Sequence, residues 1–166
     1  MASKEEKFLT AIDENKGIIY KVANAYARNK EDNKDLVQEI IFQLWRSFEA
    51  FGQRSSLSTW IYRVAFNVSV SHRRNDMRRQ WINTPISESA FVNIEQEPNA
   101  VDEKIELLQK CIKELKSLDK ALIILYLEGC SQNQIAEILG LTPTNVSTKI
   151  MRIKKQLKLK MESEND

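Results

Sequence analysis

Apolar residues recur along this chain at the three- to four-residue spacing of an amphipathic α-helix. The first such pattern predicts a helix over residues 4–28. Comparable patterns predict further helices, over residues 33–48, 58–79, 101–116 and 119–128, with two more after Cys130. Polar breaks or glycines separate these segments.

The periodicity stops between residues 83 and 100. This segment contains two prolines, several acidic residues and no regular apolar spacing, which is typical of a linker. The whole chain has only four glycines and three prolines, too few turn-forming residues for many short strands. The sequence therefore predicts an all-α fold of two small helical domains, at residues 1–81 and 104–161, joined by a flexible acidic linker at residues 82–103.

Composition narrows the setting in which the chain works. Of its 166 residues, 42% are hydrophobic, which is enough to form a folded core. The longest uninterrupted apolar run, residues 121–127, falls far short of the roughly 20 residues that span a bilayer, so we expect no stable membrane insertion. No secretory signal is visible, and Cys111 and Cys130 form neither a disulfide framework nor a zinc-ligand cluster. The sequence predicts a cytoplasmic protein without a metal site.

Charged residues occur in blocks that the formal net charge of +2 conceals. Residues 53–81 carry six arginines and one aspartate, whereas residues 82–110 carry six acidic residues and two lysines. Residues 146–160 then carry six basic residues and no acidic one. A single basic block is more often a solvated helix face. Two such blocks, each on an amphipathic helix, suggest two contacts with a polyanion.

Residues 130–155 contain the most specific local signal. Ser131 and Gln134 have the spacing of a capping box, which predicts the start of a short helix. Gly140 supplies the left-handed residue that ends this helix. Thr142 followed by Pro143 predicts the start of the next one. Two helices joined by a tight glycine-containing turn form a helix-turn-helix.

The second of these helices separates apolar from polar positions. Its polar side presents short side chains and an arginine, which a DNA major groove admits to the base edges, with lysines placed to meet phosphates. This pattern predicts a duplex-DNA interface. The other interpretation is an ordinary antiparallel helix pair with a lysine-rich outer face. The apolar stripe consists of Val146, Ile150, Ile153 and Leu157. Opposite it lie Thr144, Thr148, Met151, Arg152 and Lys155, flanked by Lys149, Lys154 and Lys158.

The helix predicted over residues 58–79, with Ser58 as its amino-terminal cap, has an unusual polar side. It carries Tyr62, Arg63 and Phe66, and such alternation suits unpaired bases, because rings stack on bases while guanidinium groups hold the backbone. The alternative is that Tyr62 and Phe66 pack against another helix of the same domain, and the sequence leaves both possibilities open. The residues that we expect to face inward are Leu57, Trp60, Ile61, Val64 and Val68.

Three stretches together resemble successive motifs of one protein family. They are DLVQEIIFQLW at residues 35–45, STWIYRVAFN at residues 58–67 and the helix-turn-helix at residues 130–155. In this order and spacing they are similar to the extracytoplasmic-function (ECF) group of bacterial RNA polymerase sigma factors, in the sigma-70 family. The resemblance extends over residues 8–160 and implies two helical domains, the family's regions two and four, without region three. It implies a transcription initiation factor that is not an enzyme and has no cofactor.

The resemblance also assigns roles to the residues at matching positions. The second helix would dock on the clamp helices of the largest subunit of core RNA polymerase, through Asp35, Gln38, Glu39 and Phe42. The third helix and the loop before it would hold the single-stranded −10 promoter element, through Arg54, Ser55, Ser56, Arg63, Asn67, Arg73 and Arg74. The helix-turn-helix would touch the flap of the second-largest subunit and read the −35 duplex, through Thr144, Asn145, Ser147, Thr148, Lys149, Met151, Arg152 and Lys155. An anti-sigma factor is a further implied partner.

The chain departs from the family pattern at two places. Ser147 stands where the family often carries a lysine or arginine, so one −35 contact is in doubt or is replaced by Arg152. Residues 114–119 stand where many relatives begin region four with a Leu-Pro motif. We expect Ser117 to cap the following helix instead.

Two rival functions remain at the level of the sequence. A stand-alone helix-turn-helix regulator would bind duplex operators without polymerase, but it leaves the motif at residues 35–45 unexplained. A small nuclease would need a catalytic base, for which His72 is the only histidine, and a cluster of metal-binding carboxylates that the sequence does not show. We therefore expect His72 to face solvent or DNA.

Overall fold

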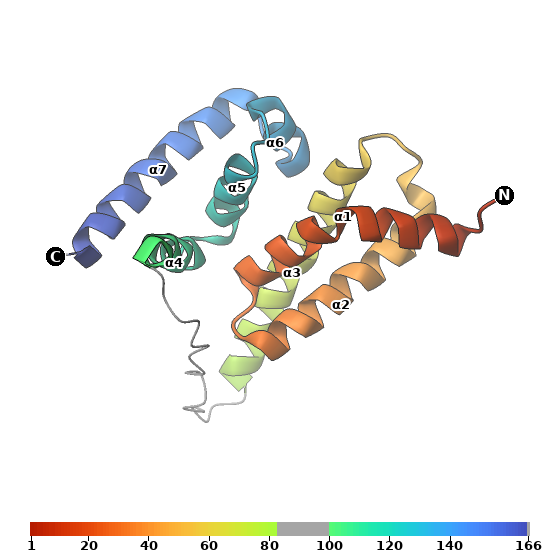
Figure 1. Cartoon of the computed structure of the whole chain (residues 1–166), viewed down its shortest axis with the longest axis horizontal. Coiled ribbons are helices and arrows are strands. Elements are labelled where there is room, and N and C mark those ends of the chain that lie inside the picture. The colour runs from red at the N-terminus through yellow and green to blue at the C-terminus, as the bar shows by residue number, and fades with distance from the viewer. Residues whose placement is uncertain (83–99, 166) are drawn as a thin grey trace. The chain divides into compact units, whose positions relative to one another are not determined.

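The computed structural model describes residues 1–82 and 100–165, without the side chains of residues 74–82 and 100–102. Within this part every regular element is helical, which confirms the all-α fold (Figure 1). The chain divides into two compact units, Met1–Phe91 and Val92–Asp166. Most of the linker predicted at residues 82–103 lies outside the described residues, so its flexibility stays a prediction. The elements are α1 (Lys4–Tyr26), α2 (Lys30–Ser47), a 3-10 turn (Glu49–Phe51), α3 (Leu57–Ile82), α4 (Ala100–Lys113), α5 (Ser117–Leu127), α6 (Gln132–Leu139) and α7 (Pro143–Asn165).

The amino-terminal unit is a bundle of α1, α2 and α3, each of which packs on the other two. Local caps fix where the first two helices begin. Ser3 and Glu6 form a reciprocal capping box at α1, and the Asn29 side chain accepts a hydrogen bond from the Asp32 N–H at 2.8 Å. Because Asn29 caps it, α2 begins three residues earlier than the pattern of apolar residues predicts. The fully buried side chains include Ile19, Val22, Tyr26, Leu36, Ile40, Leu44 and Ile61.

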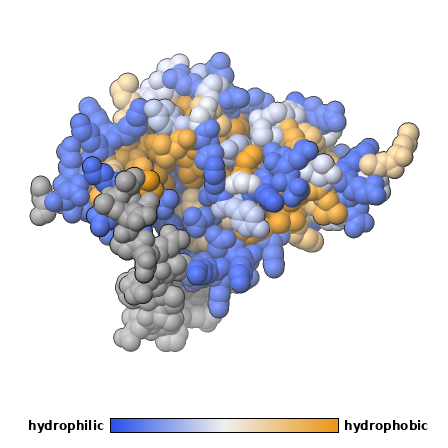
Figure 2. Space-filling view, in the orientation of Figure 1, coloured by the Kyte–Doolittle hydropathy of each residue, from blue (hydrophilic) through white to orange (hydrophobic). Residues whose placement is uncertain are grey.

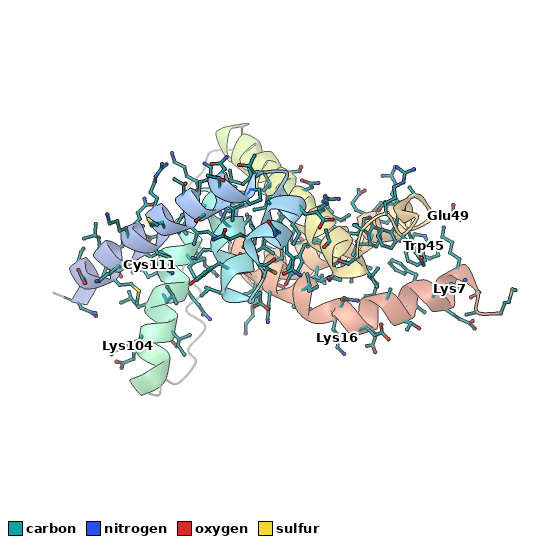
Figure 3. All side chains as sticks on the ribbon, turned by 90° about the horizontal axis from the view of Figure 1, so that it is seen from above. Lys7, Lys16, Trp45, Glu49, Lys104 and Cys111 are labelled. Atoms are coloured by element: carbon teal, nitrogen blue, oxygen red, sulfur yellow. The ribbon has the colours of Figure 1, made fainter. Side chains whose placement is uncertain are left out.

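A cluster of aromatic rings closes the end of this unit that precedes α3. Phe8 on α1 meets Trp45 at a centroid distance of 5.0 Å and Phe48 at 5.3 Å, both edge to face. Trp60 on α3 lies 4.8 Å from Phe51. Figure 3 shows Trp45 beside the amino-terminal turns of α1. The cluster therefore anchors the connection from α2 to α3, which is the predicted −10 loop.

The start of α3 corrects one prediction. The hydroxyl of Ser56, not that of Ser58, accepts the hydrogen bond from the Thr59 N–H at 3.2 Å. The Ser56 carbonyl also accepts from the Trp60 N–H at 3.1 Å. Ser56 is thus the residue that caps α3, and Ser58 lies in its first turn.

The carboxy-terminal unit consists of α4–α7, and α7 packs on each of the other three helices. Cys111 is buried on α4 where that helix meets α7 (Figure 3). Lys116 occupies the capping position of α5 without a side-chain cap, and Ser117 is the first helical residue. The prediction that Ser117 caps α5 is therefore wrong. The other fully buried side chains include Lys120, Leu122, Leu125, Ile135 and Ile153.

The outer surface mixes polar and apolar areas on the face that Figure 2 displays. Among the described residues, none of the helices has the length and apolar character needed to cross a membrane.

Candidate nucleic-acid and protein-docking faces

The helix-turn-helix is held by the caps that the sequence predicts. Ser131 Oγ accepts from the Gln134 N–H at 3.1 Å, and the Gln134 side chain accepts from the Ser131 N–H at 2.8 Å. Gly140 ends α6 in the left-handed conformation, with φ of 70°. The Asn145 N–H then donates to Thr142 Oγ1 at 3.1 Å, which fixes the start of α7. These local bonds set the direction in which α7 leaves the turn.

The apolar stripe of α7 is buried and its polar side is open. Val146, Ile150, Ile153 and Leu157 are all buried against the other helices of the unit. The eight predicted −35 residues lie on the remaining surface, where Ser147 and Lys149 are half-buried and the other six are exposed. Met151 is the most accessible large apolar side chain among them, with 67% of its surface exposed. The structure therefore places all eight on one accessible side of the recognition helix.

A groove of about 640 Å³ runs along one flank of α7. Lys154, Lys155 and Lys158 line it on the α7 side, and Tyr126 at the end of α5 lines it opposite. Lys154 Nζ donates to the Tyr126 hydroxyl at 2.8 Å and also lies 4.6 Å from the centre of its ring. The sequence analysis missed Tyr126. The only local signal in the sequence is that Tyr126 is an aromatic residue close to Gly129, and this signal does not indicate a contact with α7.

The side of α3 that the sequence left open divides between core and surface. Tyr62 and Phe66 are buried, with 8% and 4% of their surfaces exposed. Their rings stack at a centroid distance of 6.0 Å, and Phe66 meets Tyr26 of α1 at 6.2 Å. The two rings are part of the domain core, and the interpretation that they stack on bases is wrong for this structure.

The exposed surface of α3 is consequently narrow. Arg63, Asn67 and Ser71 are exposed at successive four-residue intervals, which places them on one strip. Arg73 is half-buried and its charge acts on Tyr26, whose pKa burial raises above the ordinary range. Arg73 therefore lies on the α1 side and away from the strip. Arg74 belongs to the part of α3 whose side chains are not described.

The loop at residues 52–56 continues this surface beyond the start of α3. Gly52 and Gln53 both have φ of 55°, a left-handed conformation that glycine adopts freely and glutamine does not. Arg54 and Ser56 are exposed, and Ser55 is half-buried. The loop therefore presents one cation and two hydroxyl groups next to the first turn of α3.

The predicted docking residues occupy one side of α2. Asp35, Gln38 and Phe42 are exposed and Glu39 is partly exposed. Phe42 exposes 56% of its surface and has the Arg46 guanidinium 5.8 Å from its ring centre. The arrangement offers an apolar side chain within a polar and acidic surface. Such a surface is typical of a site for another protein.

The sequence analysis expected His72 to face solvent or DNA, and this expectation is wrong. The His72 side chain is only 16% exposed, and its Nε2 lies 2.7 Å from Asp32 Oδ1 while its Nδ1 lies 3.2 Å from Glu39 Oε2. Burial of the Asp32 carboxyl opposes its ionisation. Hydrogen bonds from His72 and from the Arg28 N–H, with the charges of both residues, outweigh burial and hold the Asp32 pKa below its ordinary value. Across the described part of the chain, no three His, Cys, Asp or Glu side chains come together as a metal site.

Two family models match the chain in the order that the motifs suggest. Sigma-70 region 2 matches residues 11–79, and Sigma-70, region 4 matches residues 105–157. The chain belongs to the sigma-70 family. The first match contains α2 and most of α3, up to residue 79, and the second contains the helix-turn-helix.

Named relatives place this sigma factor in the extracytoplasmic-function group. It is 25% identical over 158 residues to "RNA polymerase sigma factor SigV" of Bacillus subtilis, which covers 95% of this chain and 92% of the relative. It is 27% identical to "ECF RNA polymerase sigma-E factor" of Haemophilus influenzae, over 86% of this chain and 82% of the relative. Proteins of this family are generally non-catalytic transcription initiation factors. A stand-alone helix-turn-helix regulator is not favoured, because region 2 is present as well.

Solved structures agree on the fold. The sigma factor RpoE of Bartonella quintana, in complex with the anti-sigma factor NepR, superposes with a TM-score of 0.71 at 19% identity and covers 95% of this chain and 96% of its own. CnrH, in complex with the cytosolic domain of CnrY, gives a TM-score of 0.70 at 16% identity, over 97% and 91%.

Proposed function

We propose that this sigma factor binds core RNA polymerase through α2, reads the −35 promoter element as a duplex through α7, and holds the −10 element as a single strand through α3 and its preceding loop. The observation that carries the proposal is that both matched regions present accessible cations, Arg54 and Arg63 in the first and Arg152 and Lys155 in the second. The α7 face has the shape and chemistry that a major groove admits. The strip of α3 is narrow and polar, which suits contacts to an unpaired strand and its phosphates. Because its proposed partners are core RNA polymerase and promoter DNA, we propose that the protein acts in the cytoplasm.

Selection of promoter DNA, followed by transcription from the selected sequences, tests the proposal as a whole. Core polymerase reconstituted with this protein would be used to select promoter DNA from a random library. We expect enriched sequences with two conserved blocks, and transcripts that start at a fixed distance from them. Binding of the isolated protein to duplex operators, with no dependence on core polymerase, would contradict the proposal.

Base reading and phosphate binding on α7 are separable. We expect Arg152→Ala to relax sequence preference at the −35 element, at a cost of roughly 1–3 kcal/mol if its contact with guanine is bidentate. Lys155→Ala should weaken binding to every sequence alike and lower the salt slope by about one. Both side chains are exposed one turn apart, so neither change disturbs the core. Affinities for the selected promoter and for single-base variants, measured across salt concentrations, distinguish the two roles. Equal losses on every sequence for both variants would contradict base reading by Arg152.

Strand capture must now come from the polar strip, because Tyr62 and Phe66 lie in the core. Opening DNA costs about 1.4 kcal/mol per base-pair step in lost stacking. Hydrogen bonds from Asn67 to an unpaired base and charge pairing of Arg63 with a phosphate offset part of that cost only after the strand separates. The loop with Arg54 adds a second cation next to the first turn of α3.

We expect Asn67→Ala and Arg63→Ala to impair promoter opening more than initial promoter binding by the holoenzyme. Loss of the Arg63 contact should lower the equilibrium constant for opening by about tenfold or more, since a hydrogen bond to a charged group contributes about 1.5–3 kcal/mol. Loss of the Asn67 contact should lower it by about two- to tenfold, since a neutral hydrogen bond contributes about 0.5–1.5 kcal/mol. Permanganate reactivity of the −10 thymines measures opening, and gel-shift affinity at low temperature measures initial binding. Ser71→Ala, further along the same strip, is the matched control. Normal opening by both folded variants would place the capture site elsewhere.

An anti-sigma factor is part of the proposal as well. RpoE and CnrH both superpose on most of this chain; RpoE is in complex with the anti-sigma factor NepR, and CnrH is in complex with the cytosolic domain of CnrY. Phe42 on α2 is an exposed apolar side chain, and we expect such an inhibitor to cover it in place of polymerase. Competition between the two partners for α2 is the expected behaviour.

A further inference from the structure

His72 is the only histidine of the chain, and both of its ring nitrogens meet carboxylates of α2. Nε2 lies 2.7 Å from Asp32 Oδ1, and Nδ1 lies 3.2 Å from Glu39 Oε2. The His72 and Asp32 side chains are 16% and 14% exposed, whereas Glu39 is 44% exposed. One ring therefore ties a largely covered carboxylate and a more accessible carboxylate of α2 to α3.

The hydrogen-bond donors and acceptors of the imidazole ring indicate which protonation state fits this site. A neutral imidazole has one N–H donor and one nitrogen lone pair, and an ionised carboxylate offers only acceptors. With a carboxylate at each nitrogen, the neutral ring would turn a lone pair toward one of them. The imidazolium form donates to both, and each bond is then charge-assisted. This geometry favours a positively charged ring between two negative groups.

We propose that His72, as an imidazolium, is a positioning residue that holds Glu39 in place on the polymerase-docking face of α2. Asp32 fixes the ring from the buried side, and the ring fixes Glu39 at the surface. The remaining exposure of Glu39 leaves its carboxylate available to a partner. This inference rests on the proposed function, because Glu39 must lie in the interface with core polymerase.

The surrounding charges favour the same state. Asp32 and Glu39 approach the ring from α2, and Arg73 is the neighbouring residue on α3. Arg28, between α1 and α2, donates its N–H to Asp32 Oδ2 at 2.9 Å. The two arginines oppose protonation of the ring, but the carboxylates are in direct contact with it. The interaction is complete at pH values above the range in which Asp32 protonates. It is lost as the pH rises through the folded-state pKa of His72.

A proton titration of the intact protein tests the charge without polymerase. Because the chain has a single histidine, its ring signals in NMR spectra need no assignment by mutation. We expect the His72 pKa to lie above the ordinary 6.5, because two carboxylates favour the charged ring, and to fall back toward 6.5 in Asp32→Asn/Glu39→Gln. A value at or below 6.5 in the folded wild-type chain would overturn the inference.

A double-mutant cycle tests the positioning role. We expect His72→Gln to weaken core-polymerase binding by about three- to tenfold, and to have no further effect in a Glu39→Gln background. Asp35→Asn is the matched control, since Asp35 is an exposed carboxylate one turn before Glu39. Its loss and that of His72→Gln should add. A purely structural role of His72 would instead give the same loss in all three backgrounds and overturn the inference.

The pH dependence of the wild-type chain keeps the test decisive if His72→Gln fails to fold. Core-polymerase affinity should fall by about three- to tenfold as the pH passes above the His72 pKa, and this fall should be absent in Glu39→Gln. A fall of equal size in both proteins would overturn the positioning role. If the wild-type chain binds core polymerase at no pH, the proposed function itself fails. Binding that is unaffected by Glu39→Gln overturns only the inference.

Discussion

Phe66→Ala is expected to lower the free energy of unfolding of the amino-terminal unit by about 3–5 kcal/mol, because the change leaves a cavity where a large buried ring was. Phe66 is 4% exposed, and the centroid of its ring lies 6.0 Å from that of Tyr62 and 6.2 Å from that of Tyr26. Since small domains are stable by only about 5–15 kcal/mol, the change should remove a large part of the stability of the unit. Chemical denaturation followed by circular dichroism measures the effect.

The matched control for Phe66→Ala is Tyr20→Ala on α1. Tyr20 is an aromatic residue of similar size with 56% of its surface exposed, so its removal should change stability by no more than about 0.5 kcal/mol. A Phe66→Ala protein that keeps wild-type stability but loses affinity for single-stranded −10 DNA would contradict the placement of Phe66 in the core.

Glu39→Lys combined with Phe42→Ala is expected to weaken binding to core RNA polymerase by about 30-fold or more, corresponding to roughly 2 kcal/mol or more. The first change reverses a charge on the docking face, and the second removes its exposed apolar side chain. Phe42 is 56% exposed and Glu39 is partly exposed, so the helical bundle should remain folded. Competition of the variant with labelled wild-type protein for core polymerase measures the loss.

Tyr20→Ala serves here too, because Tyr20 and Phe42 have equal exposed fractions and lie on different helices. It should bind core polymerase like the wild type. Unchanged affinity of the double variant, with the fold intact by circular dichroism, would remove α2 from the docking surface. In that case Asp35 and Gln38 would lose their assigned role with it.

The helix-turn-helix was predictable almost completely because its signals are local. The capping box of Ser131 and Gln134, the left-handed Gly140 and the cap of Thr142 each act within four residues of sequence. Side-chain spacing then determines which face of α7 is apolar. Residues close in sequence therefore determine this motif, and contacts between residues distant in sequence do not override their local preferences.

Other caps show where local signals fail to choose. Ser56 and Ser58, two residues apart, are both suitable caps for α3. The structure uses Ser56, and Trp60 in the first turn of the same helix packs in the aromatic cluster. The same limit applies to Ser117, which fits a cap by its type but becomes the first residue of α5. A one- or two-residue choice of helix start changes local free energies by little, so tertiary contacts decide it.

The sequence by itself determined the two helical domains, the matched order of their motifs and the basic face of α7, because periodicity, caps and charge are properties of neighbouring residues. Only the tertiary structure decided the roles of Tyr62, Phe66 and His72. A helix that packs on one neighbour has a single buried stripe, but α3 packs on both α1 and α2. Its buried arc is therefore wide enough to include both rings. His72 meets carboxylates 33 and 40 residues earlier in the chain, and no local pattern encodes a contact at that separation.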